Sequence, residues 1–306
     1  MSAGLAFVLS RAASAAATLL LSSLGIFAAI HALPGGYADV FLGAYATPEA
    51  KARIERQFGL NDPLPAQYAK WLKAAAQGDF GVSLVTQKPV AEEFMARLPT
   101  TATIASLAAA LALLIGAPAG LLAGLLDGAA VAQGVARLCG SLAISVPDFV
   151  IGTLLLFLAS RVFPAATGLS TTLLPALTLS ALGVGLIMTA ARHSSVAVSR
   201  GAFVRAAVAR GASPLQILGR HIVRNAAIPV ATVFGVYFGY LLGGTAIVES
   251  IFTVPGVGRY LLQAVQLRDY PVVQAGALIA ASVFVALNLI VDLAYGWLDP
   301  RIRTSR

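Results

Sequence analysis

Charged residues are unusually scarce in this sequence. Only 11% of its 306 residues are Asp, Glu, Lys or Arg, while 58% are hydrophobic. A soluble domain carries about 25% charged residues, so the composition excludes an ordinary soluble protein. The apolar residues form long charge-free runs rather than alternating segments of about ten residues, which excludes a transmembrane β-barrel. The sequence therefore predicts an all-α polytopic membrane protein.

Residues that could carry covalent or metal chemistry are also scarce. The single cysteine, Cys139, excludes an intramolecular disulfide. The three histidines (His31, His193 and His221) lie far apart without an HExxH pair, and no GxSxG nucleophile elbow is present. No Gly-Lys pair exists, so the chain lacks the loop that cradles ATP phosphates. We expect no catalytic residue, no metal site and no cofactor bound by this chain.

Six apolar runs are long enough to cross a membrane. They cover about residues 12–33, 100–126, 138–160, 173–189, 226–248 and 272–293. A secretory signal is the alternative for the first run, but signal peptides have an apolar core of only about 7–15 residues. The third run is interrupted by Pro147-Asp148. We expect one transmembrane domain over residues 1–306 with six transmembrane helices.

An arginine-rich segment separates the fourth and fifth runs. Residues 191–230 contain six arginines and no acid, within a chain of formal net charge +8. Basic loops between membrane spans lie on the cytoplasmic side, which explains the positive charge better than nucleic-acid binding does. Counting six spans from this loop places both termini inside.

The same segment, residues 192–225, also has a local pattern. Phe203 to Ala207 predicts a short helix, Gly211 predicts a break, and Ser213-Pro214 predicts a new helix start. Val204 and Val208, four residues apart, predict an apolar stripe on the short helix. We interpret this pattern as a helix that docks into a cleft on a soluble partner. The alternative, that any inner loop is basic, explains the arginines but not the glycine break.

Two other loops are expected outside the membrane. Residues 34–99 carry seven basic and seven acidic residues, a neutral balance that fits an exported, lid-like loop. Thr47-Pro48, Pro65 and Pro89 each predict the start of a short amphipathic helix in it. Residues 249–271 form the second outer loop.

Asp148 is the one acid well inside a predicted span. Such a carboxylate is costly and favours a functional hypothesis, here a polar group on a translocation path beside Pro147. The alternative is a structural carboxylate that neighbouring helices satisfy or that caps a broken helix. The sequence leaves both open.

Several motifs occur in order along almost the whole chain. In the first third they are Leu33-Pro34-Gly35, Ala46 to Ala50, Phe58 to Leu64, Gly78-Asp79-Phe80-Gly81 and Arg97 to Thr101. Later ones are Ser145 to Phe149, Phe203 to Gly211, Glu249 to Phe252, Pro255 to Arg259, Arg268 to Pro271 and Asp299 to Arg303. With these motifs, the chain resembles the permease subunits of binding-protein-dependent ABC importers, in the dipeptide/oligopeptide/nickel branch.

The resemblance implies a fold of the type I ABC importer permease kind and a multi-subunit transporter in the bacterial cytoplasmic (inner) membrane. Its other parts would be a second homologous permease, two ATP-binding subunits that hydrolyse ATP with Mg, and an extracytoplasmic substrate-binding protein. This chain would form half of the translocation pathway and couple to ATP hydrolysis without binding ATP. Alternating access would follow from movement of the segment Val204–Gly211 as a lever.

The resemblance also assigns residues. Those implied to contact the ATP-binding subunits are Phe203, Val204, Arg205, Ala206, Ala207, Val208, Arg210, Gly211, His221 and Arg224. Those implied to face the binding protein are Glu249, Phe252, Pro255, Gly256, Gly258, Arg259, Asp269 and Tyr270. The family usually has an acidic residue and then a tyrosine where Ala202 and Phe203 stand, so we expect a weaker docking contact or a differently shaped cleft.

Two other functions are open at this point. An ion-coupled secondary transporter would need paired intramembrane acids or broken helices in both halves, and only Asp148 qualifies. A structural membrane subunit without transport activity is the second alternative. For the importer, short peptides are the leading substrate, with nickel chelates, glutathione, opines and some sugars as alternatives.

Overall fold

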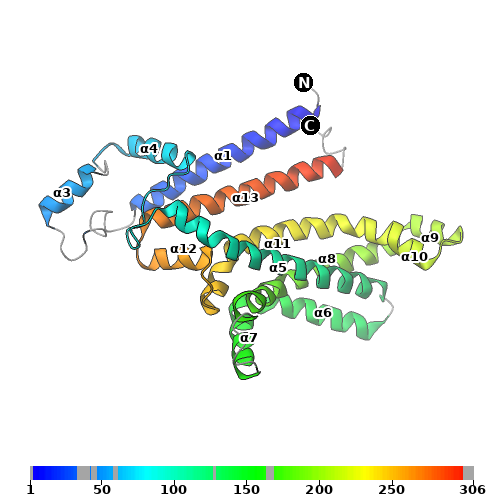
Figure 1. Cartoon of the computed structure of the whole chain (residues 1–306). Coiled ribbons are helices and arrows are strands. Elements are labelled where there is room, and N and C mark those ends of the chain that lie inside the picture. Colours follow the sequence, from blue (N-terminus) through cyan, green and yellow to red (C-terminus); the bar gives the residue numbers. More distant parts are fainter. Residues whose placement is uncertain are drawn as a thin grey trace. The chain divides into compact units, whose positions relative to one another are not determined.

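The computed structural model describes residues 3–32, 42, 47–57, 61–126, 129–162 and 169–298 (Figure 1). Within these residues the chain is helical, with no strand beyond an isolated antiparallel bridge between Val82 and Pro89. The chain forms two compact units. Unit 1 comprises residues 1–99 and 259–306, and unit 2 comprises residues 100–258. The prediction of a single domain stays a prediction.

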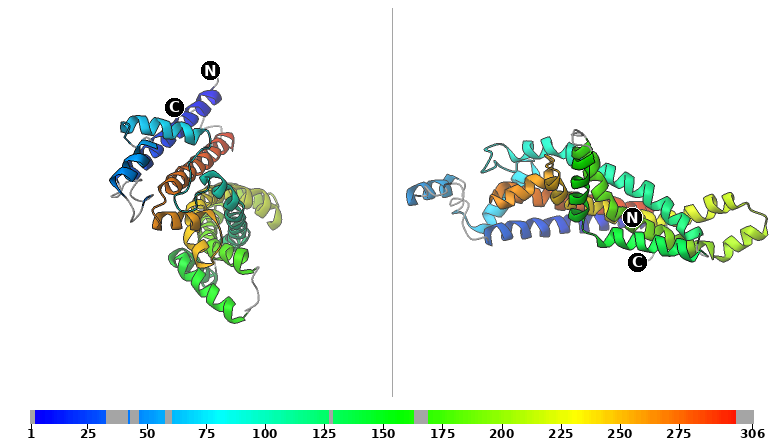
Figure 2. Two further views of the ribbon diagram at one scale, coloured as in Figure 1. Left: turned by 60° about the vertical axis from the view of Figure 1, so that its left-hand side comes forward. Right: turned by 90° about the horizontal axis from the view of Figure 1, so that it is seen from below.

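Unit 1 is built around two long apolar helices. These are α1 (Ala3–Ala32) and α13 (Tyr270–Leu298), which pack against each other and lie side by side in both views (Figures 1 and 2). The unit also contains α3 (Pro48–Gln57), α4 (Leu64–Ala76), the start of α5 (Val90–Leu125) and most of α12 (Val257–Gln266).

The amphipathic helix α4 packs on α1. The Tyr68 hydroxyl lies 2.8 Å from Ser23 Oγ, and the rings of Tyr68 and Trp71 lie 5.4 and 6.0 Å from the Phe27 ring. The predicted cap of α3 is confirmed, because Thr47 Oγ1 accepts a hydrogen bond from Ala50 N at 3.2 Å. The motifs at 33–35 and 299–303 lie outside the described residues.

Unit 2 is arranged around one central helix, α8 (Leu174–Ser199). Helices α6 (Ala130–Ser145), α7 (Asp148–Val162) and α11 (Arg224–Ile251) all pack on it. Between α8 and α11 lie three short elements, namely α9 (Ala202–Ala209), α10 (Pro214–Ile217) and the π-helical turn η3 (Leu218–Val223). A second π-helical turn, η2 (Leu169–Leu173), leads into α8. The core includes Leu179 and Ile187 of α8 with Tyr237 and Leu241 of α11.

Three glycines on α5 let its backbone touch α8 directly. Gly116, Gly120 and Gly124 are spaced four residues apart, on one face of the helix. A Cβ added at any of them would lie less than 3.0 Å from a backbone carbonyl oxygen of α8, those of Val184, Met188 and Arg192 in turn. We call this contact the glycine seam. Small residues at helix contacts of this kind are typical of packing within membranes.

Within the described residues, five helices are long and apolar enough to span a membrane. They cover Phe7–Ala32, Val90–Leu125, Thr171–Ser199, Pro214–Leu241 and Tyr270–Ile290. A further pair, Gln133–Ser145 and Asp148–Val162, passes the same test together but bends by 97° at the break. Counting the bent pair as one span gives six, which agrees with the predicted number and with the interruption at Pro147-Asp148.

The boundaries of these helices differ from the predicted ones. A short helix from Pro89 and a separate span from Thr100 are wrong, because α5 is one helix that continues through Pro99. Proline in a helix removes a hydrogen bond, but buried side chains on either side, Val90 and Phe94 before it and Ile104 after it, hold the helix in place. Likewise α8 continues to Ser199, so the predicted loop 192–225 begins inside a helix.

Candidate functional site

The short helix α9 is bounded by a glycine at each end. Gly201 precedes it with extended backbone, and Gly211 follows it with φ +80°. Gly211 N donates to Val208 O at 2.9 Å and Ala212 N donates to Ala207 O at 3.1 Å, the pair of bonds that defines a Schellman motif. Only glycine adopts such a φ without strain, so the predicted glycine break is confirmed.

The next helix start is also confirmed. Ser213 and Gln216 form a reciprocal capping box, with Ser213 N donating to Gln216 Oε1 at 3.0 Å and Gln216 N donating to Ser213 Oγ at 3.4 Å. Because both ends of the turn are fixed, α9 and α10 form a defined corner rather than a loose loop.

Helix α9 has a buried face and an exposed face. Val204 and Ala207 are buried, whereas Val208 is 57% exposed. The predicted Val204–Val208 stripe is therefore wrong, because the chain itself covers Val204 and Ala207, three residues apart, and leaves Val208 in the open. Sequence spacing alone allows either pairing, and packing within unit 2 selects one of them.

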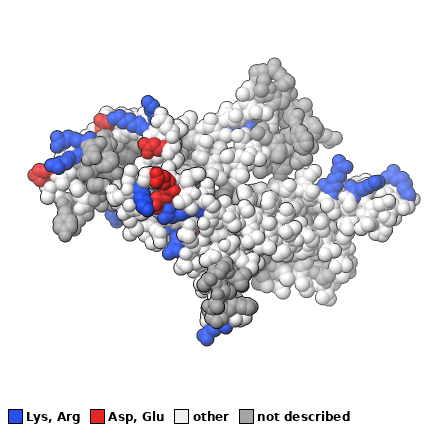
Figure 3. Space-filling model, in the orientation of Figure 1, with Lys and Arg blue, Asp and Glu red and all other residues white. Residues whose placement is uncertain are grey.

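The exposed face of this corner combines apolar and basic residues. Phe203 is 46% exposed and Leu215 is 79% exposed. Arg205, Ala206, Arg210, Gly211 and Arg224 are exposed beside them, and His221 is half-buried, with its ring 6.0 Å from the Phe203 ring. On the face shown in Figure 3, basic side chains gather over α9 and α10 and no acidic side chain lies among them. This surface could bind an acidic or apolar cleft.

A buried polar chain joins the start of this segment to two other helices. Arg192 Nη1 on α8 donates to Gln133 Oε1 on α6 at 3.0 Å, and Gln133 Nε2 donates to Ala123 O on α5. Gln133 is buried, and Ser195 Oγ donates to Leu121 O on α5 at 3.4 Å. The sequence analysis did not find these contacts. The signal available in the sequence was Gln133 itself, because a glutamine in a largely apolar stretch needs hydrogen-bond partners for its amide when it is buried.

Pro147 and Asp148 lie where α6 ends and α7 begins. Asp148 Oδ2 accepts a hydrogen bond from Tyr240 OH of α11 at 2.8 Å. Both residues, with Tyr240, line a pocket of about 300 Å³ whose other walls are apolar. The sequence identified Pro147 and Asp148 as a pair but not Tyr240, which is 92 residues away.

Local contacts offset the free-energy cost of placing a charged Asp148 within a membrane span. A carboxylate at the centre of a span costs roughly 2.5–3.5 kcal/mol on insertion scales. The N-terminus of α7 contributes about 0.3–1 kcal/mol and a hydrogen bond to a charged group about 1.5–3 kcal/mol. Together these terms are of the same size as the cost. Among the described residues no Lys or Arg forms an ion pair with it.

Glu249, near the end of α11, is fully buried. Thr101 Oγ1 donates to Glu249 Oε1 at 2.7 Å and accepts from Val257 N at 2.9 Å, so the two side chains fix the start of α12. Gly256 packs on the Glu249 carboxylate, where any Cβ would collide with it. Gly258 packs on the backbone of Ala246, where an added Cβ would lie 2.7 Å from it. This carboxylate holds the turn 252–258 in shape.

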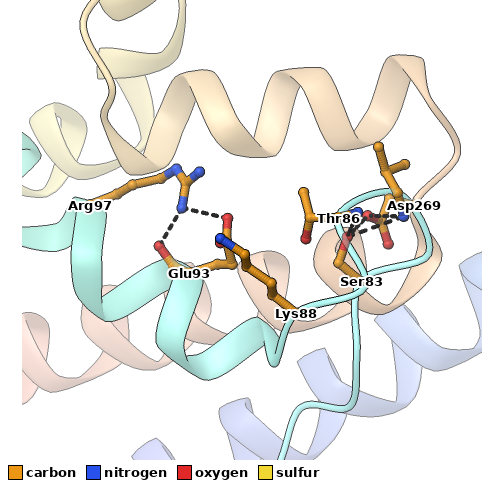
Figure 4. Close-up of polar contacts among 7 residues, drawn as sticks. Ser83, Thr86, Lys88, Glu93, Arg97 and Asp269 are labelled. Carbon is orange, nitrogen blue, oxygen red and sulfur yellow. Dashed lines mark hydrogen bonds and ion pairs between the residues drawn. The ribbon is translucent and has the colours of Figure 1, made fainter.

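Asp269 likewise holds a loop in shape, in unit 1. It is buried and accepts from Ser83 Oγ, from Leu84 N at 3.0 Å and from Val85 N at 3.4 Å (Figure 4). Ser83 Oγ in turn accepts from Thr86 N at 2.9 Å. Residues 83–86 are therefore attached to the turn that precedes α13.

An ion pair at the start of α5 lies close to this loop in Figure 4. Glu93 pairs with Arg97 at 2.7 Å and with Lys88 at 4.0 Å. The Arg97 guanidinium lies 4.2 Å from the centre of the Tyr260 ring. Burial, with the nearby charges of Glu93 and Asp269, raises the pKa of the Tyr260 phenol, so this side chain is neutral at physiological pH.

The residues that were predicted to face a binding protein differ in how far they are buried. Glu249, Phe252, Gly256, Asp269 and Tyr270 are buried, Gly258 and Arg259 are half-buried, and Pro255 is exposed. The buried members support the loops from within. Val82, Val85 and Leu267, by contrast, are exposed. The predicted role of the loops stays a prediction.

Comparison with known proteins identifies the family. Residues 116–304 match the family model described as "Binding-protein-dependent transport system inner membrane component". Residues 4–105 match the model of the N-terminal part of the membrane component of such systems.

Three relatives align with almost the whole chain. A probable peptide ABC transporter permease protein of Sinorhizobium fredii is 34% identical over 97% of this chain and 99% of its own length. A dipeptide transport system permease protein of Alkalihalophilus pseudofirmus is 32% identical (98% and 99%), and a glutathione transport system permease protein of Salmonella paratyphi A is 37% identical (97% and 98%). The chain therefore belongs to the family of inner membrane components of binding-protein-dependent transport systems, which are multi-pass ABC transport permeases rather than enzymes.

Proposed function

We propose that this chain is one of two permease subunits of an ATP-driven importer and forms half of its translocation pathway. Two ATP-binding subunits bind at α9 on the cytoplasmic side and hydrolyse ATP with Mg. A substrate-binding protein delivers the solute on the other side. Both termini lie in the cytoplasm, which agrees with the basic residues of segment 191–230 and of the C-terminus.

The exposed face of α9 is the observation that carries this proposal. A helix of eight residues, fixed by a glycine at each end, buries Val204 and Ala207 and leaves Phe203 and Val208 in the open. Apolar side chains exposed next to arginines on a rigid corner are typical of a docking surface, because little ordering entropy is lost on binding. The Schellman motif and the capping box fix the ends of this corner, so its exposed side chains are held in defined positions.

The connection of α9 to the rest of unit 2 supports a coupling role. Gly201, two residues after the end of α8, begins the turn into α9, and α8 is tied to α5 by the glycine seam and to α6 through Arg192 and Gln133. A displacement of α9 is therefore transmitted to helices that enclose the pathway. Alternating access follows when ATP-driven closure of the partner subunits moves this block.

The substrate proposed is a short peptide or a related small solute. The relatives named above are a peptide, a dipeptide and a glutathione permease. Glutathione is itself a peptide derivative, so all three names point to solutes that carry amide bonds and charged ends.

The coupling role is tested by charge reversal and by backbone strain. With the ATP-binding subunits of the same transporter co-expressed, Arg205→Glu should weaken their association at least tenfold, about 1.4 kcal/mol. Gly211→Ala should weaken it less, by the strain of a Cβ at positive φ. The matched controls are Arg53→Glu, an exposed arginine on α3, and Gly219→Ala, whose added Cβ meets nothing within 4 Å and whose φ is not positive. Unchanged association and unchanged ATP hydrolysis in both α9 variants would overturn the proposal.

Sidedness is tested by thiol labelling. In a Cys139→Ser background, which removes the exposed natural thiol, a cysteine at Ala206 should react with an impermeant maleimide only from the cytoplasmic side. A cysteine at Val85 should react only from the opposite side. Labelling of position 206 from outside would contradict the orientation.

A further inference from the structure

The pocket at the bend between α6 and α7 combines apolar lining residues with one carboxylate and one phenol. Its volume is about 300 Å³, the lower end of the range for small-molecule sites, so it fits a single residue or a compact group rather than a whole peptide. Ile144, Phe149, Leu182 and Ile247 line it with apolar surface. Asp148 is the only charged residue in the lining, and Tyr240 adds a phenol.

The carboxylate of Asp148 is held in one position and has room for another partner. Tyr240 OH occupies one oxygen, Oδ2, and the start of α7 fixes the backbone beneath it. No hydrogen bond to Oδ1 and no ion pair joins Asp148 to another residue of the part of the chain that the structure describes. A carboxylate that is oriented in advance beside apolar surface attracts a cation, because nothing has to rearrange before binding.

A metal ion is a poor occupant of this pocket. Hard cations take six or more oxygen ligands, or keep several waters, and the lining offers one carboxylate and one phenol. Among the described residues no group of three or more His, Cys, Asp or Glu could hold a metal. An ammonium group needs only a few acceptors and tolerates apolar surroundings on its carbon side.

We propose that this pocket binds a protonated amine that carries an apolar substituent. The ammonium donates to Asp148, and the phenol oxygen of Tyr240 accepts a further hydrogen bond from it. The substituent packs on Ile144, Phe149, Leu182 and Ile247. Resting on the proposed function, the inference names the end of the substrate that this half of the pathway recognises. It is the amino terminus and first side chain of a peptide, whereas a carboxylate end is repelled.

The test compares two probes that differ only in charge. Leucinamide carries a free ammonium, and N-acetyl-leucinamide has the same side chain without it. Equilibrium binding of each is measured to the complete transporter in nanodiscs, without the binding protein, so that the selectivity of that protein does not enter. Wild type should bind leucinamide at least tenfold more tightly than N-acetyl-leucinamide.

Three variants assign that preference to the pocket. Asp148→Asn keeps the shape and should reduce the ratio of the two affinities to about one. Tyr240→Phe should reduce it less, since the carboxylate remains. Glu92→Gln removes an exposed carboxylate elsewhere and should leave the ratio unchanged. Each variant is checked for intact assembly by size-exclusion chromatography.

Equal binding of the two probes by wild type, or an unchanged preference in Asp148→Asn, would overturn the inference. The same preparations report separately on the proposed function. If ATP-driven uptake and association with the ATP-binding subunits are intact while the ratio is one, the amine site is wrong and the importer stands. If the ATP-binding subunits do not associate at all, the proposed function fails instead.

Discussion

The corner at α9 and the loops around Glu249 and Asp269 use charged residues in opposite ways. At α9 the arginines and Phe203 point outward, and small or β-branched side chains fill the interior. In the loops the carboxylates point inward, where Glu249 fixes the start of α12 and Asp269 fixes residues 83–86. The first arrangement leaves chemistry available to a partner. The second uses it to give a backbone segment a defined shape.

Buried and exposed residues of these segments therefore have different roles. Glu249 is buried and supports the backbone of its own loop, whereas Phe203 is 46% exposed and open to contact from outside the chain. We expect substitutions to separate these roles, because loss of a buried support lowers the stability of the chain and, under the proposed function, loss of an exposed side chain lowers affinity for a partner.

The largest loss of stability is expected for Glu249→Ala. It leaves the Thr101 hydroxyl without its acceptor and opens a cavity beneath Gly256, which together should lower the free energy of unfolding by about 3 kcal/mol. Thermal unfolding in detergent, compared with the exposed control Glu92→Ala, measures the effect. If Glu249→Ala unfolds at the wild-type temperature, this carboxylate does not support the turn.

Asp269→Asn should produce a smaller and more local change. The amide keeps one acceptor oxygen but loses the charge that strengthens the hydrogen bonds from Ser83, Leu84 and Val85, a loss of about 1.4 kcal/mol. Amide hydrogen exchange at Leu84 and Val85 should accelerate roughly tenfold. Asp79→Asn, which affects only the amide of Gly81, is the control. Equal protection in both variants would show that the loop is held by something else.

The two valines of α9 give a matched pair. Val204→Ala removes two buried methyl groups and should lower stability by about 1.5 kcal/mol, whereas Val208→Ala should change it by less than about 0.5 kcal/mol. Thermal unfolding of the two variants measures the difference directly. Equal losses would mean that α9 does not have the inner and outer faces described here.

The smallest effect on stability is expected for Phe203→Ala. This side chain is 46% exposed, so its removal should change the free energy of unfolding by less than about 0.5 kcal/mol. If it anchors the docking contact, affinity for the ATP-binding subunits should nevertheless fall by about 2 kcal/mol, roughly 30-fold. Pull-down titration measures the affinity. Loss of stability without loss of affinity would place Phe203 with the buried supports instead.

Local features of this fold were predictable from sequence. The Thr47 cap, the Gly211 break, the Ser213 start and the interruption at Pro147 each depend on a few neighbouring residues whose conformational preferences act over one turn. The spans were also predictable, because an apolar run of about twenty neighbouring residues is enough to indicate a transmembrane helix.

Contacts between distant segments were not predictable. Asp148 meets Tyr240 across 92 positions, Thr101 meets Glu249 across 148, and Ser83 meets Asp269 across 186. Each pair exists because helices pack in one arrangement, and no local pattern specifies which faces meet. The same packing decided that Val204 rather than Val208 is buried, and it kept α5 helical through Pro99.

The glycine seam determines where unit 2 can bend. Longer side chains between helices tilt and repack when the helices shift, but Gly116, Gly120 and Gly124 bring the α5 backbone directly against backbone carbonyls and short or branched side chains of α8. We therefore expect α5 and α8 to move together as one body. We expect flexing at the break at Pro147 instead, where the bent pair changes direction by 97°. Pro147 lines the pocket, so a bend there should change the width of the pocket.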